Sequence, residues 1–288
     1  MIDVANLTHR FKQETALTDI SFTMEKGMTY GLIGRNGAGK TTLLSILASF
    51  LPKQEGTFQY KGEDPFENQL LMSDIQFVYQ ADYSDETDNV MDYLKLFARY
   101  LPRFDRERAL ALLKAFDVPL NKPIHSLSTG KQSALNISLG LAARSEVLIF
   151  DEAYQGLDAP GREIFYSKVL EEQQIDPKII ILSTHLVSEM DYLFDHVLIL
   201  DKGSLVVNEP AETFRARGVT ITGHKDVVTA FTENKQVIQK RELGPTVAYT
   251  LYGEPDKGEL REMKDVGLEL TAVSLQDLFI FLTEEEST

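Results

Sequence analysis

The stretch from Gly34 to Thr41 constrains the fold of this chain more than any other, because it reads Gly-Arg-Asn-Gly-Ala-Gly-Lys-Thr. It follows a short apolar run, Tyr30–Ile33, and leads into apolar residues at helical spacing in Thr41–Leu47. Glycines let backbone N–H groups wrap a phosphate, and the helix that follows directs its first N–H groups at the same anion. The pattern therefore predicts a strand, a phosphate-binding loop and a helix of an α/β nucleotide-binding domain.

Within this loop, the residue types indicate what each position would contact. Lys40 would bring its positive charge to the β- and γ-phosphates of ATP, and the hydroxyl of Thr41 is a natural Mg²⁺ ligand. The remaining ATP-binding candidates are Gly34, Arg35, Asn36, Gly37, Ala38, Gly39 and Thr42. By itself the loop indicates a nucleotide and its Mg²⁺ and says little about the reaction.

Composition narrows the possible partners. The net charge is −15 and no basic patch interrupts it, so we expect no nucleic-acid partner. Cysteine is absent, which excludes disulfides, thiolate metal sites and thiol nucleophiles. The N-terminus lacks the pattern of a signal peptide, and no apolar run approaches the roughly 18 residues of a membrane span. Any connection to a membrane is therefore expected to go through another protein.

A second candidate site lies where a buried strand ends in two carboxylates. Val147–Phe150 is wholly apolar and is followed by Asp151 and Glu152. Downstream of a phosphate-binding loop, Asp151 is expected to hold Mg²⁺ directly or through water, and Glu152 to polarise the attacking water as a general base. Carboxylates at a strand end are otherwise often part of a solvated turn, so the catalytic interpretation depends on the loop upstream.

A third candidate is His185, which comes shortly after the apolar run Ile179–Leu182. A single histidine is more often structural than catalytic. In an open α/β sheet, however, ligands bind at the carboxyl ends of the strands, where this residue would lie. His185 could there donate to the γ-phosphate or position the water.

These motifs, in this order, resemble the nucleotide-binding subunits of ABC transporters over about residues 2–208. Leu127–Gln132, which reads Leu-Ser-Thr-Gly-Lys-Gln, is similar to the ABC signature Leu-Ser-Gly-Gly-Gln. Further matches are Gln80 to the Q-loop glutamine that senses Mg²⁺, Gly156–Asp158 to the D-loop, His185 to the switch histidine and Phe11 to the aromatic residue that stacks on adenine. For Phe11, a role as a core or edge residue is nearly as good an interpretation.

The resemblance implies an α/β fold with a P-loop ATPase core of the ABC type at residues 1–208. Within it, a helical subdomain at about 84–145 would carry the signature. A small C-terminal α+β domain is expected at 209–288. The resemblance also implies two ATPase subunits that face each other head to tail, each ATP lying between one P-loop and Ser128 and Gly130 of the other subunit. Integral-membrane subunits would receive the motion, which would place the chain in the cytoplasm at the inner face of the cell membrane.

Within this family, the chain is similar to the separately encoded ATPases of bacterial peptide and antibiotic exporters, which commonly end in a helix such as Ser274–Phe279. Two alternatives stay open. One is a soluble ABC ATPase outside transport, such as a scaffold for metal-cluster assembly. The other is an ATP-gated regulator that turns over slowly in a heterodimer.

Two signature residues depart from the family. Thr129 replaces a glycine and adds a β-branched side chain where backbone should approach phosphate, and Lys131 replaces a glutamine and adds charge near the nucleotide. Both favour slower hydrolysis at this site or a heterodimeric partner. Ala153–Gln155 also departs from the usual Pro-Thr-Ser, and we expect this change to be tolerated.

The loop after Gln80 is acidic, and its function stays open. Its carboxylates are Asp82, Asp85, Glu86 and Asp88. They are either a solvated loop or a docking site for a basic helix of the membrane subunit.

Overall fold

The computed structural model describes residues 1–12, 14–253 and 256–283, and the chain divides into two compact units. The first unit contains residues 1–185 and 192–208, and the second contains 186–191 and 209–288. The second unit therefore includes a short helix, α7 (Val187–Met190), that the sequence analysis placed in the first domain.

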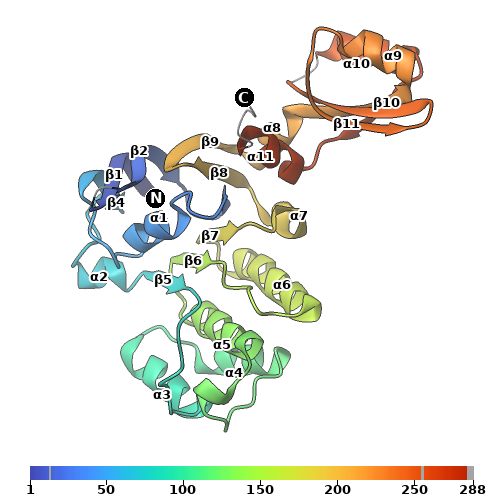
Figure 1. Ribbon diagram of the computed structural model, residues 1–288. Coiled ribbons are helices and arrows are strands. Elements are labelled where there is room, and N and C mark those ends of the chain that lie inside the picture. The colour runs from blue at the N-terminus through green and yellow to red at the C-terminus, as the bar shows by residue number, and fades with distance from the viewer. Residues whose placement is uncertain (13, 254–255, 284–288) are drawn as a thin grey trace. The chain divides into compact units, whose positions relative to one another are not determined.

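The first unit is built on a six-stranded sheet (Figure 1). Its strands follow the order β5 (Ile75–Val78), β6 (Val147–Asp151), β7 (Ile179–Thr184), β3 (Thr29–Gly34), β8 (His196–Asp201) and β9 (Ser204–Pro210). Neighbouring strands from β5 to β8 are parallel, as expected for short apolar strands that are covered on both faces. In register, Asp151 lies beside Ser183 and Ile33 beside Thr184. The phosphate loop, the two carboxylates and His185 consequently leave the sheet at one edge.

A smaller antiparallel sheet packs with the first one around a single helix. It contains β2 (Glu14–Met24), β1 (Ile2–Phe11) and β4 (Glu55–Tyr60). Helix α1 (Lys40–Leu47) lies between the two sheets, and its Leu43, Leu44 and Leu47 are buried in a core shared with both. Four apolar side chains of β2 are buried in this core: Leu17, Ile20, Phe22 and Met24. This packing fixes α1 directly behind the phosphate loop.

The middle of the chain is helical, as the sequence predicts. The helices of this part are α3 (Val90–Tyr100), α4 (Arg106–Ala115), the short turn η1 (Ile124–Ser126) and α5 (Thr129–Ala142). Asn89, Asp105 and Ser128 precede the three α-helices, and each side chain accepts a hydrogen bond from the backbone three residues later. The remaining helices of the first unit are α2 (Gln69–Met72), α6 (Ala159–Ile175) and η2 (Asp191–Leu193).

A buried ion cluster ties this helical part to the sheet. Glu172 of α6 is fully buried; one carboxylate oxygen pairs with Arg108 of α4, and the other lies 2.7 Å from Nζ of Lys178. Lys178 is buried too and also pairs with Asp176 at 3.1 Å. Charges out of water are tolerated only when paired in this way, so the cluster fixes α4 against α6.

The second unit is a small α+β domain. Its antiparallel sheet has the order β11 (Gln236–Leu243), β12 (Thr246–Tyr252), β10 (Gly218–His224) and β13 (Glu269–Ala272). Its other helices are α8 (Ala211–Ala216), α9 (Lys225–Thr232), α10 (Lys257–Asp265) and α11 (Leu275–Thr283). The succession β10-α9-β11-β12-α10-β13 with this strand order is the split β-α-β, or ferredoxin-like, arrangement. Val228 of α9 and Met263 of α10 pack on one face of the sheet, against Ile221 and Tyr249.

Candidate functional site

The phosphate loop is a tight turn between β3 and α1. All residues of β3 are buried, and α1 begins immediately after Gly39, whose φ is 102°. Gly37 has a φ of 82°, so both positions have the left-handed conformation that glycine adopts at little cost. A Cβ on Gly39 would lie 2.6 Å from the carbonyl oxygen of Ala16, and one on Gly34 2.7 Å from that of Leu200. The glycines are therefore required by backbone shape as well as by access to phosphate.

A cleft of about 710 Å³ opens over this loop. Its lining contains the loop residues Asn36, Gly37, Gly39, Lys40, Thr41 and Thr42, with Phe11, Glu14, Thr15, Ala16, Glu152, Lys202 and Gly203. Of the other loop candidates, Ala38 is buried and Gly34 ends β3, while Arg35 is exposed beside the cleft. Phe11 lines the cleft and is 48% exposed, and its ring lies 4.8 Å from that of His9, between centroids, in a T-shaped arrangement. The structure thus brings the expected adenine-stacking aromatic to the same cleft as the loop.

Lys40 lies at the floor of the cleft. Its side chain is only 6% exposed, and Nζ donates to the carbonyl oxygens of Gly34 at 2.8 Å and Arg35 at 3.3 Å. Nζ is also 3.7 Å from Oε1 of Glu152. The ammonium is therefore held by neutral acceptors and one carboxylate, at the position where a phosphate would bring further negative charge.

Asp151 and Glu152 are joined through Ser183 on the next strand. The Ser183 hydroxyl donates to Oδ1 of Asp151 at 2.6 Å and accepts from the backbone N–H of Glu152 at 3.1 Å. Glu152 has a φ of 47°, an uncommon value for a residue other than glycine. This turn directs the Glu152 carboxylate toward His185, whose Nδ1 is 3.2 Å from Oε1. The Glu152 carboxylate, which follows β6, thus lies close to two residues that follow other strands: Lys40 after β3 and His185 after β7.

A second, adjoining pocket of about 430 Å³ collects the expected metal ligands. Thr41, Gln80, Asp151 and Glu152 line it, together with Ser45, Phe50, Phe77, Tyr79 and Gln155. The hydroxyl, amide and carboxylate oxygens in this set are the hard donors that Mg²⁺ prefers. The residues present therefore fit a magnesium ion that bridges protein and phosphate oxygens.

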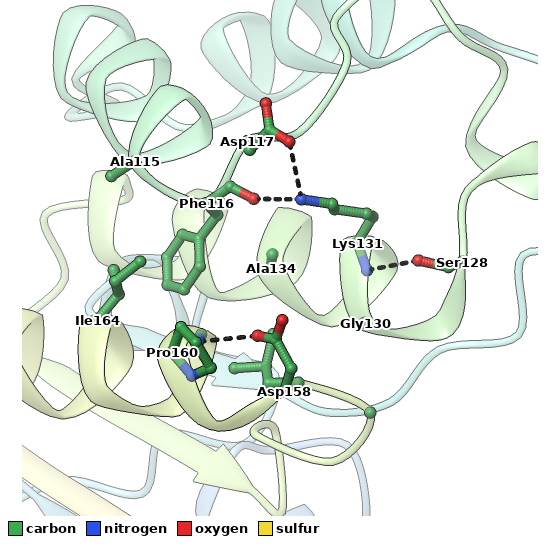
Figure 2. A pocket seen from close by; sticks show the side chains of 13 residues that line it. Ala115, Phe116, Asp117, Ser128, Gly130, Lys131, Ala134, Asp158, Pro160 and Ile164 are labelled. Atoms are coloured by element: carbon green, nitrogen blue, oxygen red, sulfur yellow. Dashed lines mark hydrogen bonds and ion pairs between the residues drawn. The ribbon is translucent and has the colours of Figure 1, made fainter.

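The signature residues lie elsewhere, as Figure 2 shows. Ser128 caps α5 by accepting from the N–H of Lys131 at 3.4 Å, and Gly130 lies so close to the D-loop that a Cβ would be 2.4 Å from the carbonyl oxygen of Gly156. Both Ser128 and Gly130 line a separate pocket of about 520 Å³, with Asp158 of the D-loop on its rim. Within this chain they do not line the cleft of the phosphate loop.

Lys131 is turned away from the backbone of the signature. Its Nζ donates to the carbonyl oxygen of Phe116 at 2.7 Å and lies 3.5 Å from Asp117 (Figure 2). Phe116 ends α4, so the ammonium caps the negative end of that helix dipole. In this structure the charge expected near the nucleotide is therefore paired inside the helical part.

Sequence reasoning assigned no role to three residues that surround the catalytic candidates. Ser183 bridges Asp151 and Glu152, as described above. Gln155 donates to Oε2 of Glu152, and the Tyr154 hydroxyl lies 3.0 Å from that of Thr184 and accepts from the N–H of His185 at 3.4 Å. The sequence did carry a signal, because Tyr154 and Gln155 are two of the positions at which the chain departs from Pro-Thr-Ser.

The fold and this cleft define a P-loop ATPase. The family described as ABC transporter matches residues 17–155. The chain is 34% identical over 217 residues to the uncharacterized ABC transporter ATP-binding protein MJ1023 of Methanocaldococcus jannaschii, with 71% of this chain and 76% of that protein covered. It is 26% identical over 301 residues to the Nod factor export ATP-binding protein I of Sinorhizobium fredii, with 99% and 86% covered.

A solved structure shares the fold. A dimeric structure of MJ0796, a bacterial ABC transporter cassette, superposes with a TM-score of 0.64 at 19% identity, covering 73% of this chain and 99% of that one. The chain therefore belongs to the ABC transporter family and is an ATP-binding subunit with the ATPase activity of that class. Among the described residues, no helix is both long enough and apolar enough to cross a membrane.

Proposed function

We propose that this chain powers export through separate integral-membrane subunits, with a peptide or antibiotic-like molecule as the substrate. One support is the likeness to a protein named for Nod factor export, which extends over 99% of this chain and so includes the second unit. The chain would work in the cytoplasm, held at the inner face of the membrane by its partners.

The observation that carries the hydrolytic part of the proposal is the meeting of Lys40, Glu152 and His185. We infer that ATP enters the cleft with adenine on Phe11 and its phosphates over the loop, where Lys40 draws the β- and γ-phosphates. Glu152 then accepts a proton from the attacking water. His185, 3.2 Å from Glu152, is close enough to orient the same water or to donate to the γ-phosphate.

Thr41, Gln80 and Asp151, which line the same pocket, are proposed to hold Mg²⁺. The ion would neutralise charge on the β- and γ-phosphates. Ser183 would orient Asp151 for this task, since its hydroxyl donates to Oδ1 at 2.6 Å and so leaves Oδ2 for other contacts.

We further propose that a second ATPase subunit completes the site. Ser128 and Gly130 offer a hydroxyl and helix-start N–H groups but do not line the cleft of their own chain, so they are available to the nucleotide of a facing subunit. The dimeric state of the similar cassette supports this arrangement. ATP would close the dimer and hydrolysis would open it.

The surface beside Gln80 is proposed to receive the membrane subunit. Phe50 is 57% exposed and Tyr79 41% exposed, and both rings pack on Phe77. The acidic loop follows directly, with Asp82 and Glu86 accepting hydrogen bonds from backbone N–H groups inside the loop. A partner helix with apolar and basic side chains fits this combination. Charge neutralisation at Asp85 and Glu86 is expected to weaken stimulation of the ATPase by the membrane subunits.

The decisive experiment is Glu152→Gln in the purified chain. We expect ATP binding to persist, an ATP-dependent dimer to accumulate, and turnover to fall by about 10²- to 10⁴-fold. Glu146→Gln, at the opposite end of the same strand, is the matched control and should turn over like the parent. Unchanged turnover in Glu152→Gln would remove Glu152 as the base.

Export itself is tested in vesicles that contain the membrane subunits copurified with this chain. ATP-dependent uptake of peptide antibiotics into inside-out vesicles, absent with Glu152→Gln, is the expected result. If turnover appears only when a different ATPase subunit is added, the chain is the regulatory half of a heterodimer. Hydrolysis with no membrane subunit copurifying would favour a soluble ABC ATPase.

A further inference from the structure

The segment Ala153–Gln155 lies between Glu152 and the D-loop, and the sequence analysis expected its departure from the family to be tolerated. Ala153 and Tyr154 are buried, at 4% and 3% exposure, and Gln155 is half-buried. Gln155 lines the same pocket as Thr41, Asp151 and Glu152. A side chain of this length, so close to the expected reaction, invites a functional interpretation.

Three hydrogen bonds connect Gln155 with its surroundings. Its side-chain Nε2 donates to Oε2 of Glu152, and its backbone N–H donates to the Glu152 carbonyl oxygen at 3.0 Å. Its own carbonyl oxygen accepts from the hydroxyl of Ser133 at 2.6 Å. Ser133 is a buried residue of α5, the helix that begins at the signature serine. A chain of two hydrogen bonds, from Ser133 through Gln155, therefore joins the signature helix to the Glu152 carboxylate.

The Glu152 carboxylate is held from both sides. Oε1 lies 3.2 Å from His185 and 3.7 Å from Lys40, while Oε2 accepts from the Gln155 amide. Without that amide, the carboxylate would be free to rotate so that Oε2 also approaches Lys40, because the two opposite charges attract each other. A carboxylate that faces Lys40 with both oxygens is a poorer base and competes more strongly with phosphate for the same ammonium. The Gln155 donor opposes that rotation without adding any charge.

We propose that Gln155 is a positioning residue for hydrolysis, which orients the Glu152 carboxylate and makes that orientation depend on helix α5 through Ser133. The proposal rests on the role of Glu152 as the base. A serine, as in the usual Pro-Thr-Ser, ends two atoms short of the glutamine amide nitrogen. It could not make this contact from the same backbone position, so the arrangement belongs to this chain.

The test compares three variants at the same position with the parent. Gln155→Met keeps the length and removes the donor, Gln155→Ser introduces the family residue, and Gln155→Glu replaces the donor by a carboxylate. For Gln155→Met and Gln155→Ser we expect kcat to fall by about 10- to 100-fold while the equilibrium affinity for ATP stays within about threefold. A misoriented Glu152 carboxylate affects the chemical step more than it affects binding.

The pH profile separates positioning from a structural effect. A carboxylate in Gln155→Glu repels that of Glu152, so the pH dependence of kcat should differ from that of the parent. Gln173→Met is the matched control. Gln173 is also half-buried, and its side-chain amide donates hydrogen bonds to the Thr29 hydroxyl and the Lys178 carbonyl oxygen. None of these residues is near Glu152 in the chain. Gln173→Met should lower the free energy of unfolding and leave the pH profile unchanged.

The connection to α5 is tested by a double-mutant cycle. Ser133→Ala should reduce kcat, and Ser133→Ala with Gln155→Met should be no slower than Gln155→Met alone, because both changes break the same chain of bonds. Additive losses would overturn the connection through Ser133. A parent-like kcat and pH profile in Gln155→Met, with Glu152→Gln inactive, would overturn the positioning role alone. An active Glu152→Gln would instead overturn the proposed function itself.

Discussion

The two parts of the chain that ATP is expected to touch are built in opposite ways. The phosphate loop is enclosed: Lys40 is 6% exposed, and the glycines around it contact neighbouring carbonyl groups closely. The signature lies at the start of a helix on the surface, where Ser128 and Thr129 are exposed. Lys131 does not point to this surface, because its ammonium caps the end of α4. The loop is shaped by its own chain, whereas the signature presents an exposed hydroxyl and the start of a helix outside the cleft of its own chain.

This difference assigns different tasks to the two parts. A site that is pre-shaped by buried backbone can bind a nucleotide in the single chain. An exposed helix start that lies outside the cleft of its own chain is expected to act only when another subunit brings a phosphate to it. Changes in the loop should therefore affect binding and chemistry, and changes in the signature should affect association.

The largest effect is expected at Glu172, whose ion cluster ties the helical part that carries the signature to the sheet that carries the phosphate loop. Glu172→Ala leaves Arg108 and Lys178 as buried charges without their partner and should lower the free energy of unfolding by about 3–5 kcal/mol. Glu171→Ala, the next residue, is 37% exposed and should cost at most about 1 kcal/mol. Urea unfolding of both variants measures the difference, and equal losses would show that the buried cluster has no special role.

Next in size is Lys40→Ala, which removes the cation at the floor of the cleft. We expect kcat/KM for ATP to fall by about 10²- to 10³-fold, the range seen when one donor to a reacting oxygen is deleted. Lys202→Ala changes an exposed lysine that lines the same cleft and should lose less than about tenfold. Steady-state ATPase assays decide between them, and similar losses would contradict a special position of Lys40.

Gly130→Ala tests the signature side of the comparison. The new Cβ would lie 2.4 Å from the Gly156 carbonyl oxygen, so the signature and the D-loop must move apart. In a Glu152→Gln background, ATP-driven dimerisation should weaken by about tenfold, while ATP binding to the monomer stays the same. Light scattering and calorimetric titration measure the two quantities. Loss of ATP binding to the monomer would contradict the assignment of binding to the phosphate loop and of association to the signature.

A smaller effect is expected from Lys131→Gln, which restores the family residue. The variant loses the bond to the Phe116 carbonyl and the charge at the end of α4, at a cost of about 0.5–1 kcal/mol in the free energy of unfolding. Affinity for ATP and dimerisation should stay at the level of the parent. A changed affinity with unchanged stability would instead place the ammonium at the nucleotide.

The smallest effect concerns the pH dependence of stability. It involves a second ion cluster, in which Asp74 pairs with the more exposed side chains of Lys61 and Arg103. Burial alone would raise the pKa of Asp74, but hydrogen bonds from Lys61 and Arg103 outweigh it and hold the pKa below its usual range. Asp74 therefore stabilises the fold above its unfolded pKa of about 4, and this contribution disappears as the pH falls through the lower folded value. Asp74→Asn should flatten the decline of stability below about pH 4, as measured by thermal unfolding across pH.

Local sequence was enough to predict the elements whose chemistry is local. The glycines and Lys40 define the loop, and the apolar runs before Asp151 and His185 define buried parallel strands, which the structure contains as β3, β6 and β7. The helical middle was likewise expected, as part of the family resemblance. In the second unit, the helix expected at Ser274–Phe279 overlaps α11, whereas the arrangement of β10–β13 with α9 and α10 became visible only in the structure, because it depends on which strands pair.

What the sequence by itself determined is therefore the presence and order of the ATP-binding motifs, because each one depends on residues within a few positions of each other. Only the tertiary structure decided which side chains meet. Ser183 reaches Asp151 from a neighbouring strand, Gln155 reaches Glu152 through a turn, and Lys131 reaches the end of α4 instead of the nucleotide. The contacts of Ser183 and Lys131 depend on strand register and helix packing, which bring together residues far apart in the chain. The contact of Gln155 is local, but it depends on the shape of the turn after β6, which the sequence pattern did not reveal.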